Sequence, residues 1–130
     1  MTRSFFIINA LLLILLSGCS KSNSPQPGLT GGWRLTKVVY VRGIAPTTID
    51  YSHEMRVLQL RSDSSYTKKD LETLTESGAY NIAVLHTGNL SDTMISFNPA
   101  SNDEYKRVLR MNGLQLYLKG VDDYEVYEKQ

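Results

Sequence analysis

The sequence predicts an all-β domain, a small antiparallel meander barrel of about seven or eight strands. Three observations lead to this prediction. Short stretches alternate apolar with polar residues, turn residues separate these stretches about every 8 to 12 positions, and helical periodicity is weak along the whole chain. A β-sandwich is the alternative that the same pattern allows. We favour the barrel because a closed sheet leaves no strand edge exposed.

The first half of the domain contains three expected strands. Residues 33–41 form the first, and Lys37 interrupts its apolar face, which indicates a bulge or the end of the strand. Residues 55–61 form the second, and a polar turn leads from it into a third at 66–68. For residues 70–76 two predictions stay open, a short helix or a long polar loop.

The second half contains shorter alternating stretches. Residues 80–84 and 95–97 read as half-buried strands, and 124–128 as the last strand. The clearest element between them is a hairpin at Asn112-Gly113, a dipeptide suited to a type I′ turn because both residues tolerate positive φ. The apolar residues of its two arms are Leu109, Met111, Leu114, Leu116 and Leu118.

Tyrosine is frequent, with eight residues in the chain. The alternation predicts that Tyr66, Tyr80 and Tyr124 face the barrel interior, whereas Tyr117 and Tyr127 face outward. Two outward aromatic residues on adjacent strands can form a docking patch for a partner, or simply pair with each other across the strands.

The amino terminus has the layout of a signal peptide. Eleven of the twelve residues in 5–16 are apolar, with Asn9 the exception, and Arg3 precedes them. Twelve helical residues extend only ~18 Å, which is too short for the ~30 Å hydrocarbon core of a bilayer. The sequence therefore predicts a cleaved signal, residues 1–18, rather than a permanent membrane span.

The residues that follow, Leu16, Ser17, Gly18 and Cys19, resemble the lipobox of bacterial lipoproteins. The resemblance implies cleavage between Gly18 and Cys19 and attachment of a diacylglyceryl group, with palmitate among its acyl chains, to the Cys19 thiolate. A thiolate is a strong enough nucleophile for this transfer, and small residues give a peptidase access. The alternative is an uncleaved signal anchor that ends in a buried cysteine.

Residues 19–28 are expected to form a flexible tether between the lipid and a folded domain at 29–130. The nine residues after Cys19 contain two prolines and no large apolar side chain. The lipoprotein resemblance also implies a location. Ser20 is not the aspartate typical of inner-membrane retention, and the acidic cluster of surface export is missing, so we expect the periplasmic face of the outer membrane.

The start of the domain resembles bacterial lipocalin-like domains, which open with a Leu-x-Gly-x-Trp-x-Leu pattern. A second landmark of these domains, a strand followed by an Asp-Gly turn and a tyrosine, matches residues 58–66, with Ser64 in place of the glycine. The positions that match the opening pattern are Leu29, Gly31, Trp33 and Leu35.

This resemblance implies a structural role for Trp33, which would close one end of the barrel beneath a basic side chain. Lys129 on the last strand and Arg110 on an earlier strand are the two candidates for that side chain. It also implies a small apolar ligand inside the barrel. The interior positions expected to contact such a ligand are Leu58, Leu60, Tyr66, Tyr80, Ile82, Phe97 and Leu116. The alternative is a solid barrel that binds an envelope protein, as an accessory or an inhibitor.

Composition excludes several other classes of function. A single cysteine excludes disulfides and cysteine zinc sites. A net charge of +1 gives no electrostatic footprint for nucleic acid. The hydrophobic share of 42% suits one small core, but twelve of these residues lie in the signal segment, which favours a packed barrel over one with a large cavity.

No catalytic, metal or cofactor site is predicted, and we expect the protein not to be an enzyme. Residues 50–54 gather an Asp, a Ser, His53 and a Glu, but catalytic triads converge from separate segments, so we interpret them as a polar loop. His86 has no neighbouring ligand. The acidic pairs 103–104 and 122–123 and the basic pairs 68–69 and 106–107 are interpreted as solvated surface charge.

Overall fold

The computed structural model describes residues 28–130, and all of its regular structure is β. The signal segment, the lipobox residues Leu16, Ser17 and Gly18, and Cys19 lie outside the described residues. In the described part, no helix is long and apolar enough to cross a membrane. The strands are β1 (Gly31–Tyr40), β2 (Thr47–Asp50), β3 (Arg56–Leu60), β4 (Ser65–Asp70), β5 (Thr73–Thr87), β6 (Leu90–Phe97), β7 (Tyr105–Asn112), β8 (Gln115–Lys119) and β9 (Asp123–Lys129).

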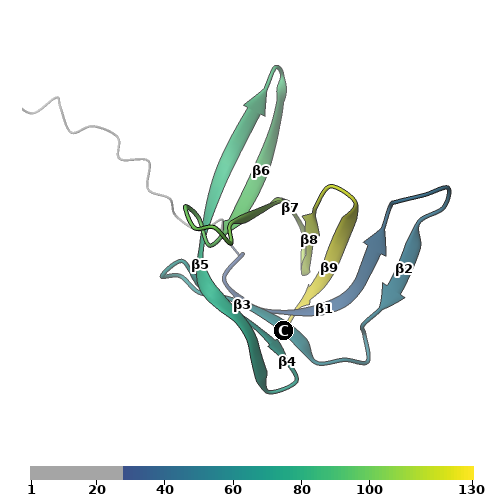
Figure 1. Cartoon of the computed structure of the whole chain (residues 1–130). Helices are drawn as coiled ribbons and strands as arrows, with labels where there is room; N and C mark the ends of the chain where they lie inside the picture. The colour runs from purple at the N-terminus through teal and green to yellow at the C-terminus, as the bar shows by residue number, and fades with distance from the viewer. Residues whose placement is uncertain (1–27) are drawn as a thin grey trace, which may run out of the picture.

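Eight of these strands close into an antiparallel barrel, as the sequence predicts. From β3 to β9 each strand pairs with the next one in the chain, and β1 joins both ends by pairing with β3 and β9. The β1–β9 ladder rules out the β-sandwich alternative. β2 is an extra strand that pairs with residues 37–40, the second half of β1. The β1–β2 hairpin extends from the barrel as an arm (Figure 1).

β1 spans the full height of the barrel and carries the expected bulge. The register to β9 shifts between Leu35 and Lys37, so Lys37 interrupts the apolar alternation without ending the strand. Residues 31–34 pair with β3, and residues 37–40 pair with β2. Strand direction therefore places the start of β1 and the ends of β3, β7 and β9 at one end of the barrel, called the closed end here.

Both predictions for residues 70–76 are wrong. The chain makes a tight turn at Leu71 and Glu72, with Leu71 at a φ of 57°, and β5 begins at Thr73. Residues 73–79 pair with β4, and one register irregularity lets the strand bend there. The polar side chains on this stretch resemble a loop in sequence because they face water or the polar part of the barrel interior.

The hairpin after β7 forms one residue later than predicted. Asn112 pairs with Gln115, so the turn is centred on Gly113 and Leu114, and only Gly113 has positive φ, at 59°. A positive φ at the first central position fits a type II′ turn. Leu114 is therefore in the turn and 73% exposed, whereas Leu116 and Leu118 are buried in β8.

The apolar core fills the closed end and the middle of the barrel. Its members alternate along the strands, which is the basis on which the sequence predicts them. The buried core residues are Leu29, Trp33, Leu35, Val38, Leu58, Leu60, Tyr66, Tyr80, Ile95, Phe97, Leu109, Leu116, Leu118 and Tyr127. Tyr66 and Tyr80 thus face inward as predicted.

The faces predicted for β9 are reversed. Tyr127 is buried in the core and pairs across the sheet with Leu35, whereas Tyr124 is only partly buried and is not a core member. The prediction treats Glu125 as solvent-exposed. Because Tyr127 lies on the same face of the strand, it is predicted to point outward as well. Glu125 instead lines the barrel mouth, because the open end of the interior is polar.

β5 and β6 continue beyond the barrel wall as a second two-stranded arm (Figure 1). The residues near its tip are exposed, including Val84, Leu85 and Leu90. The arm runs toward the closed end, because β5 has the same direction as β7 and β9.

Candidate functional site

The closed end is sealed by an indole ring with a lysine above it. Trp33 is fully buried, and its Nε1–H donates a 2.7 Å hydrogen bond to the carbonyl oxygen of Leu29. The Nζ of Lys129 lies 4.3 Å from the centre of the Trp33 ring system. It also donates hydrogen bonds to the carbonyl oxygens of Gly28, at 3.0 Å, and of Thr30. Among the residues that the structure describes, this arrangement closes the barrel without a carboxylate.

The closure requires a glycine beside the lysine. Gly31 has a φ of 123°, and a Cβ at this position would lie 2.8 Å from the Lys129 Nζ. Burial lowers the pKa of Lys129. Arg110, the other basic candidate, lies on the outer surface, where it pairs with Asp92 at 3.0 Å.

The positions expected to contact a ligand do lie together inside the barrel. Most of them, however, pack against one another and do not line a cavity. Six of the seven are buried core residues, and Ile82 is partly buried against them. Of these seven, only Leu58 also lines one of the pockets described below. The aromatic members pack closely: Tyr66 meets Phe97 edge to face at 4.7 Å. The apolar interior is thus tightly filled around these positions.

Above this core, Glu76 is the centre of a polar cluster inside the barrel. Its carboxylate accepts hydrogen bonds from the hydroxyl groups of Tyr66 and Tyr105, the latter at 2.9 Å. The ammonium of Lys68 lies 3.4 Å from Glu76 and donates to the Tyr105 oxygen at 2.7 Å. The amide nitrogen of Asn98 donates to the Tyr66 oxygen at 3.0 Å. Three strands, β4, β5 and β7, therefore meet at a single carboxylate, and the loop after β6 joins the cluster through Asn98.

The pKa shifts follow from this geometry. Burial, followed by the hydrogen bond to Glu76 and its charge, raises the pKa of Tyr66 to about 12. The same causes raise the pKa of Tyr105 above its ordinary value. Burial alone would raise the pKa of Glu76, but the Tyr66 hydrogen bond, the Lys68 charge and the Tyr105 hydrogen bond outweigh it and lower the pKa. The cluster is therefore built around an ionised Glu76 and neutral phenols.

A second charged group lies on β7 and β9. Arg107 and Asp123 form a 2.6 Å ion pair with less than a quarter of either side chain exposed. Burial lowers the pKa of Arg107, but the hydrogen bond to Asp123 and the charge of Glu125 outweigh it and raise the pKa. Burial and the charge of Glu125 raise the pKa of Tyr127 well above its ordinary value. Glu125 faces inward, because it pairs with the core residue Val38.

These charged groups border a pocket of about 290 Å³ at the open end, called the mouth here. Its apolar floor passes directly into the core, and its walls are charged. The lining residues are Leu35, Arg56, Val57, Leu58, Lys68, Lys69, Asp70, Thr75, Glu125 and Tyr127.

Arg56 supplies the positive charge on the β3 side of the mouth. Its Nε lies 2.7 Å from Glu54 and 3.5 Å from Asp70, and its guanidinium lies 4.4 Å from the centre of the Tyr51 ring. The buried Nε–H donates no aligned hydrogen bond within the described residues, so Coulomb attraction holds this contact. Arg56 is nevertheless flanked by two acids.

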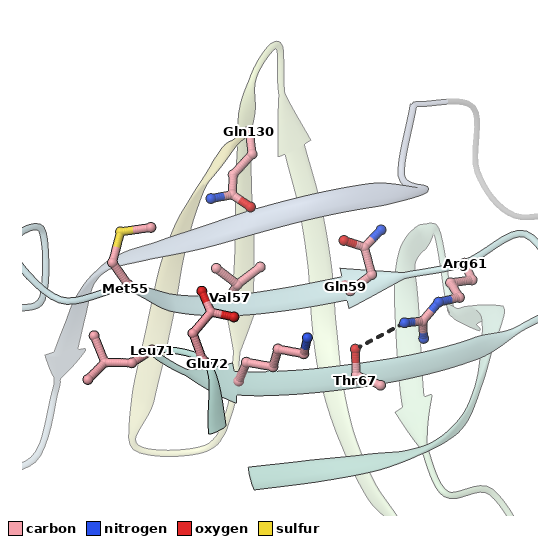
Figure 2. Close-up of a pocket in the computed structure, with 9 residues that line it drawn as sticks. Met55, Val57, Gln59, Arg61, Thr67, Leu71, Glu72 and Gln130 are labelled. Carbon is pink, nitrogen blue, oxygen red and sulfur yellow. Dashed lines mark hydrogen bonds between the residues drawn. The ribbon is translucent and has the colours of Figure 1, made fainter. Parts of the chain in front are cut away.

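A separate groove of about 430 Å³ lies on the outer surface of β3 and β4 (Figure 2). Met55, Val57 and Leu71 form an apolar end, and the other end is polar, with Arg61 donating a 3.5 Å hydrogen bond to Thr67. A third pocket lies beside the Arg107–Asp123 pair and is lined also by Tyr40 and Arg42.

Sequence reasoning missed the charged residues of the barrel interior. The interpretation of Lys68 and Arg107 as members of exposed basic pairs is wrong, because both side chains are mostly covered and paired with acids. The available signal was the spacing: Lys68 follows the inward Tyr66 by two residues, so period-2 alternation places it on the same face. His53 and His86 lie in exposed segments, and residues 28–130 contain no group of three or more potential metal ligands.

Comparison of the chain with known protein families, with curated proteins and with solved structures returned no match.

Proposed function

We propose that this protein is a lipid-anchored, non-catalytic binding protein. Cys19 carries the lipid on the periplasmic face of the bacterial outer membrane, residues 19–28 are the tether, and a lipocalin-like barrel holds one small molecule with an apolar part in its mouth. The observation that carries the proposal is the uneven filling of the barrel: the closed end is packed, and a pocket of about 290 Å³ remains at the open end.

Two further features support this function. The Trp33–Lys129 contact agrees with the closure that the lipocalin-like resemblance implies. The pocket is near the small end of the range for ligand sites, about 300 to 1,000 Å³, and combines an apolar floor with a few charged groups, which is the usual composition of such sites. Both favour one small ligand over a long lipid chain.

The anchor and the ligand are tested separately. Labelling cells with an acyl probe should mark the wild-type protein, and Cys19→Ala should remove the label and release the protein from membranes. Unchanged attachment of the variant would refute the anchor. Each buried CH₂ contributes ~0.8 kcal/mol, so several acyl chains make attachment nearly permanent.

Native mass spectrometry of protein gently extracted from membranes tests the ligand. The wild type should carry a co-purifying small molecule, and Thr75→Trp, which places an indole in the mouth, should lose it. Thr87→Trp is the matched control, because Thr87 is exposed at the far end of the same strand, in the β5–β6 arm, and does not line the mouth. A wild-type protein without any bound molecule would contradict the proposal.

A second candidate function, binding of an envelope protein, is favoured by the outer groove and by the exposed apolar residues of the two arms. Several exposed apolar residues belong to each arm, among them Val41 and Ile44 on one and Leu85 and Leu90 on the other. Exposed apolar residues that lie together are typical of an interaction site. Crosslinking in intact cells from positions in the arms should then capture one defined partner, and random capture would count against this function.

A further inference from the structure

The charges that face the barrel interior at its open half are unequal in number. Three are cations, Arg56, Lys68 and Arg107, and four are acids, Asp70, Glu76, Asp123 and Glu125. The interior therefore has one carboxylate more than it has cations. Unpaired charge in a partly enclosed site is unfavourable, so a ligand that supplies the missing charge is favoured.

Each interior cation already has a carboxylate partner. Lys68 is paired with Glu76, and Arg107 with Asp123. Arg56 lies between Glu54 and Asp70. The remaining lining cation, Lys69, stands between the inward Lys68 and Asp70 on β4, so its side chain faces the outer groove, which it also lines. Among residues 28–130, the mouth therefore has no interior cation free to bind an anionic ligand.

Glu125 is the acid that remains. Within residues 28–130 it forms no ion pair, although it lies among lining residues of the mouth. The charge of Glu125 helps to raise the pKa of Arg107, but the 2.6 Å contact of that guanidinium is with Asp123. The carboxylate is thus held at the pocket wall, beside the buried ring of Tyr127 and the apolar side chains of Leu35 and Leu58.

We propose that the mouth selects a small organic cation, with its ammonium group on the Glu125 carboxylate and its apolar part on Leu35, Leu58 and Tyr127. This inference rests on the proposed function, because it names the chemical class of the ligand for the same pocket. The ligand completes the charge balance of the interior, and its apolar part covers the exposed edge of the core. Charge-assisted hydrogen bonds of this kind are about twice as strong as neutral ones.

Three probes that differ only in their polar group test the proposal: hexylammonium, hexanol and hexanoate. They are titrated by calorimetry into the full-length protein, purified from membranes and held in nanodiscs of zwitterionic lipid, with empty nanodiscs as the blank. Hexylammonium should bind ~10- to 100-fold more tightly than hexanol, which corresponds to one hydrogen bond to a charged group. Hexanoate should bind most weakly.

Glu125→Gln should abolish the difference between hexylammonium and hexanol. Glu128→Gln is the matched control, because Glu128 lies on the same strand, pairs with Arg34 and does not line the mouth, so the difference should persist. Equal or tighter binding of hexanoate or hexanol to the wild type would overturn the inference and leave the proposed function standing. A preference that survives in Glu125→Gln would also overturn it, and absence of binding for all three probes would overturn both proposals.

Discussion

Each end of the barrel contains a lysine, and the ammonium groups of these two lysines are stabilised by different partners. At the closed end, Lys129 has no carboxylate partner in the described part of the chain and instead lies over the Trp33 ring and donates to two backbone carbonyl oxygens. At the open end, Lys68 lies against the Glu76 carboxylate and the Tyr105 hydroxyl group. Backbone carbonyls are fixed by the fold, whereas a carboxylate can change its protonation.

This difference separates stability from selectivity. At the closed end, the Trp33 ring, the aliphatic core and the Lys129 ammonium pack together. A substitution there should therefore lower the free energy of unfolding of the whole barrel. The open end keeps charged groups in balance around a pocket, so a change there should alter pH dependence and ligand choice more than folding. The following experiments measure this contrast.

The largest effect is expected for Trp33→Ala. The side chain is fully buried and its Nε1–H bonds to Leu29, so its removal leaves a cavity and an unpaired carbonyl. Loss of a buried aromatic residue costs about 3–5 kcal/mol. The free energy of unfolding in urea should fall by this amount. Tyr40→Ala, at a residue that is 41% exposed, is the control and should change little. Comparable losses at both positions would mean that the closed end is not the stabilising region.

Glu76→Gln should produce the next largest effect, about 2 kcal/mol at neutral pH, because three donors then face a neutral amide in place of a carboxylate. The effect should depend on pH. Glu76 has a lowered pKa in the folded protein, so its contribution is complete above the unfolded value of about 4.3 and is lost as the pH falls through the folded value.

The measurement is the difference in free energy of unfolding between the wild type and Glu76→Gln from neutral to acidic pH. This difference should shrink as the pH falls. Asp50 and Asp63 also have lowered pKa values, caused mainly by hydrogen bonds from Ser52 and Ser65, but both are present in the two proteins and cancel. A difference that stays constant with pH would show that Glu76 contributes through packing alone.

Lys129→Met should cost about 1 kcal/mol, since the ammonium–ring contact and the carbonyl hydrogen bonds are lost but the cost of partly burying the charge is removed as well. Methionine keeps the length of the side chain. Because no carboxylate is involved, the loss should be the same at neutral pH and at about pH 3, where carboxylates are mostly protonated. A loss that disappears in acid would assign Lys129 to an ion pair and remove the contrast with Lys68.

The alternation of apolar residues was enough to predict the barrel and most of its core. Leu58, Leu60, Tyr66 and Tyr80 lie where the period of two places them, and the interruption at Lys37 is a bulge as expected. These predictions succeeded because one face of each strand is buried against the same apolar core, so sequence and burial share one period.

The polar half of the interior could not be found in this way. The alternation pattern predicts that a charged residue is exposed to solvent. Glu125 and Lys68 nevertheless face inward, because the barrel is only partly filled with apolar side chains. That error reversed the faces of β9 and left Tyr127 on the wrong side. The pairing of Glu76 with Tyr105 depends on contact between distant segments, which no local pattern contains.

The smallest effect is expected for Arg110→Ala, which tests whether the closed end uses one particular cation. Arg110 and Lys129 are both basic residues of late strands, and sequence alone did not choose between them. Arg110 pairs with Asp92 on the outer surface, with 69% and 45% of the two side chains exposed, and such pairs contribute about 0–1 kcal/mol. We expect a loss below about 0.5 kcal/mol that vanishes in high salt, because screening weakens an exposed pair. A salt-independent loss as large as that of Lys129→Met would place Arg110 in the closure and make the cation over Trp33 interchangeable.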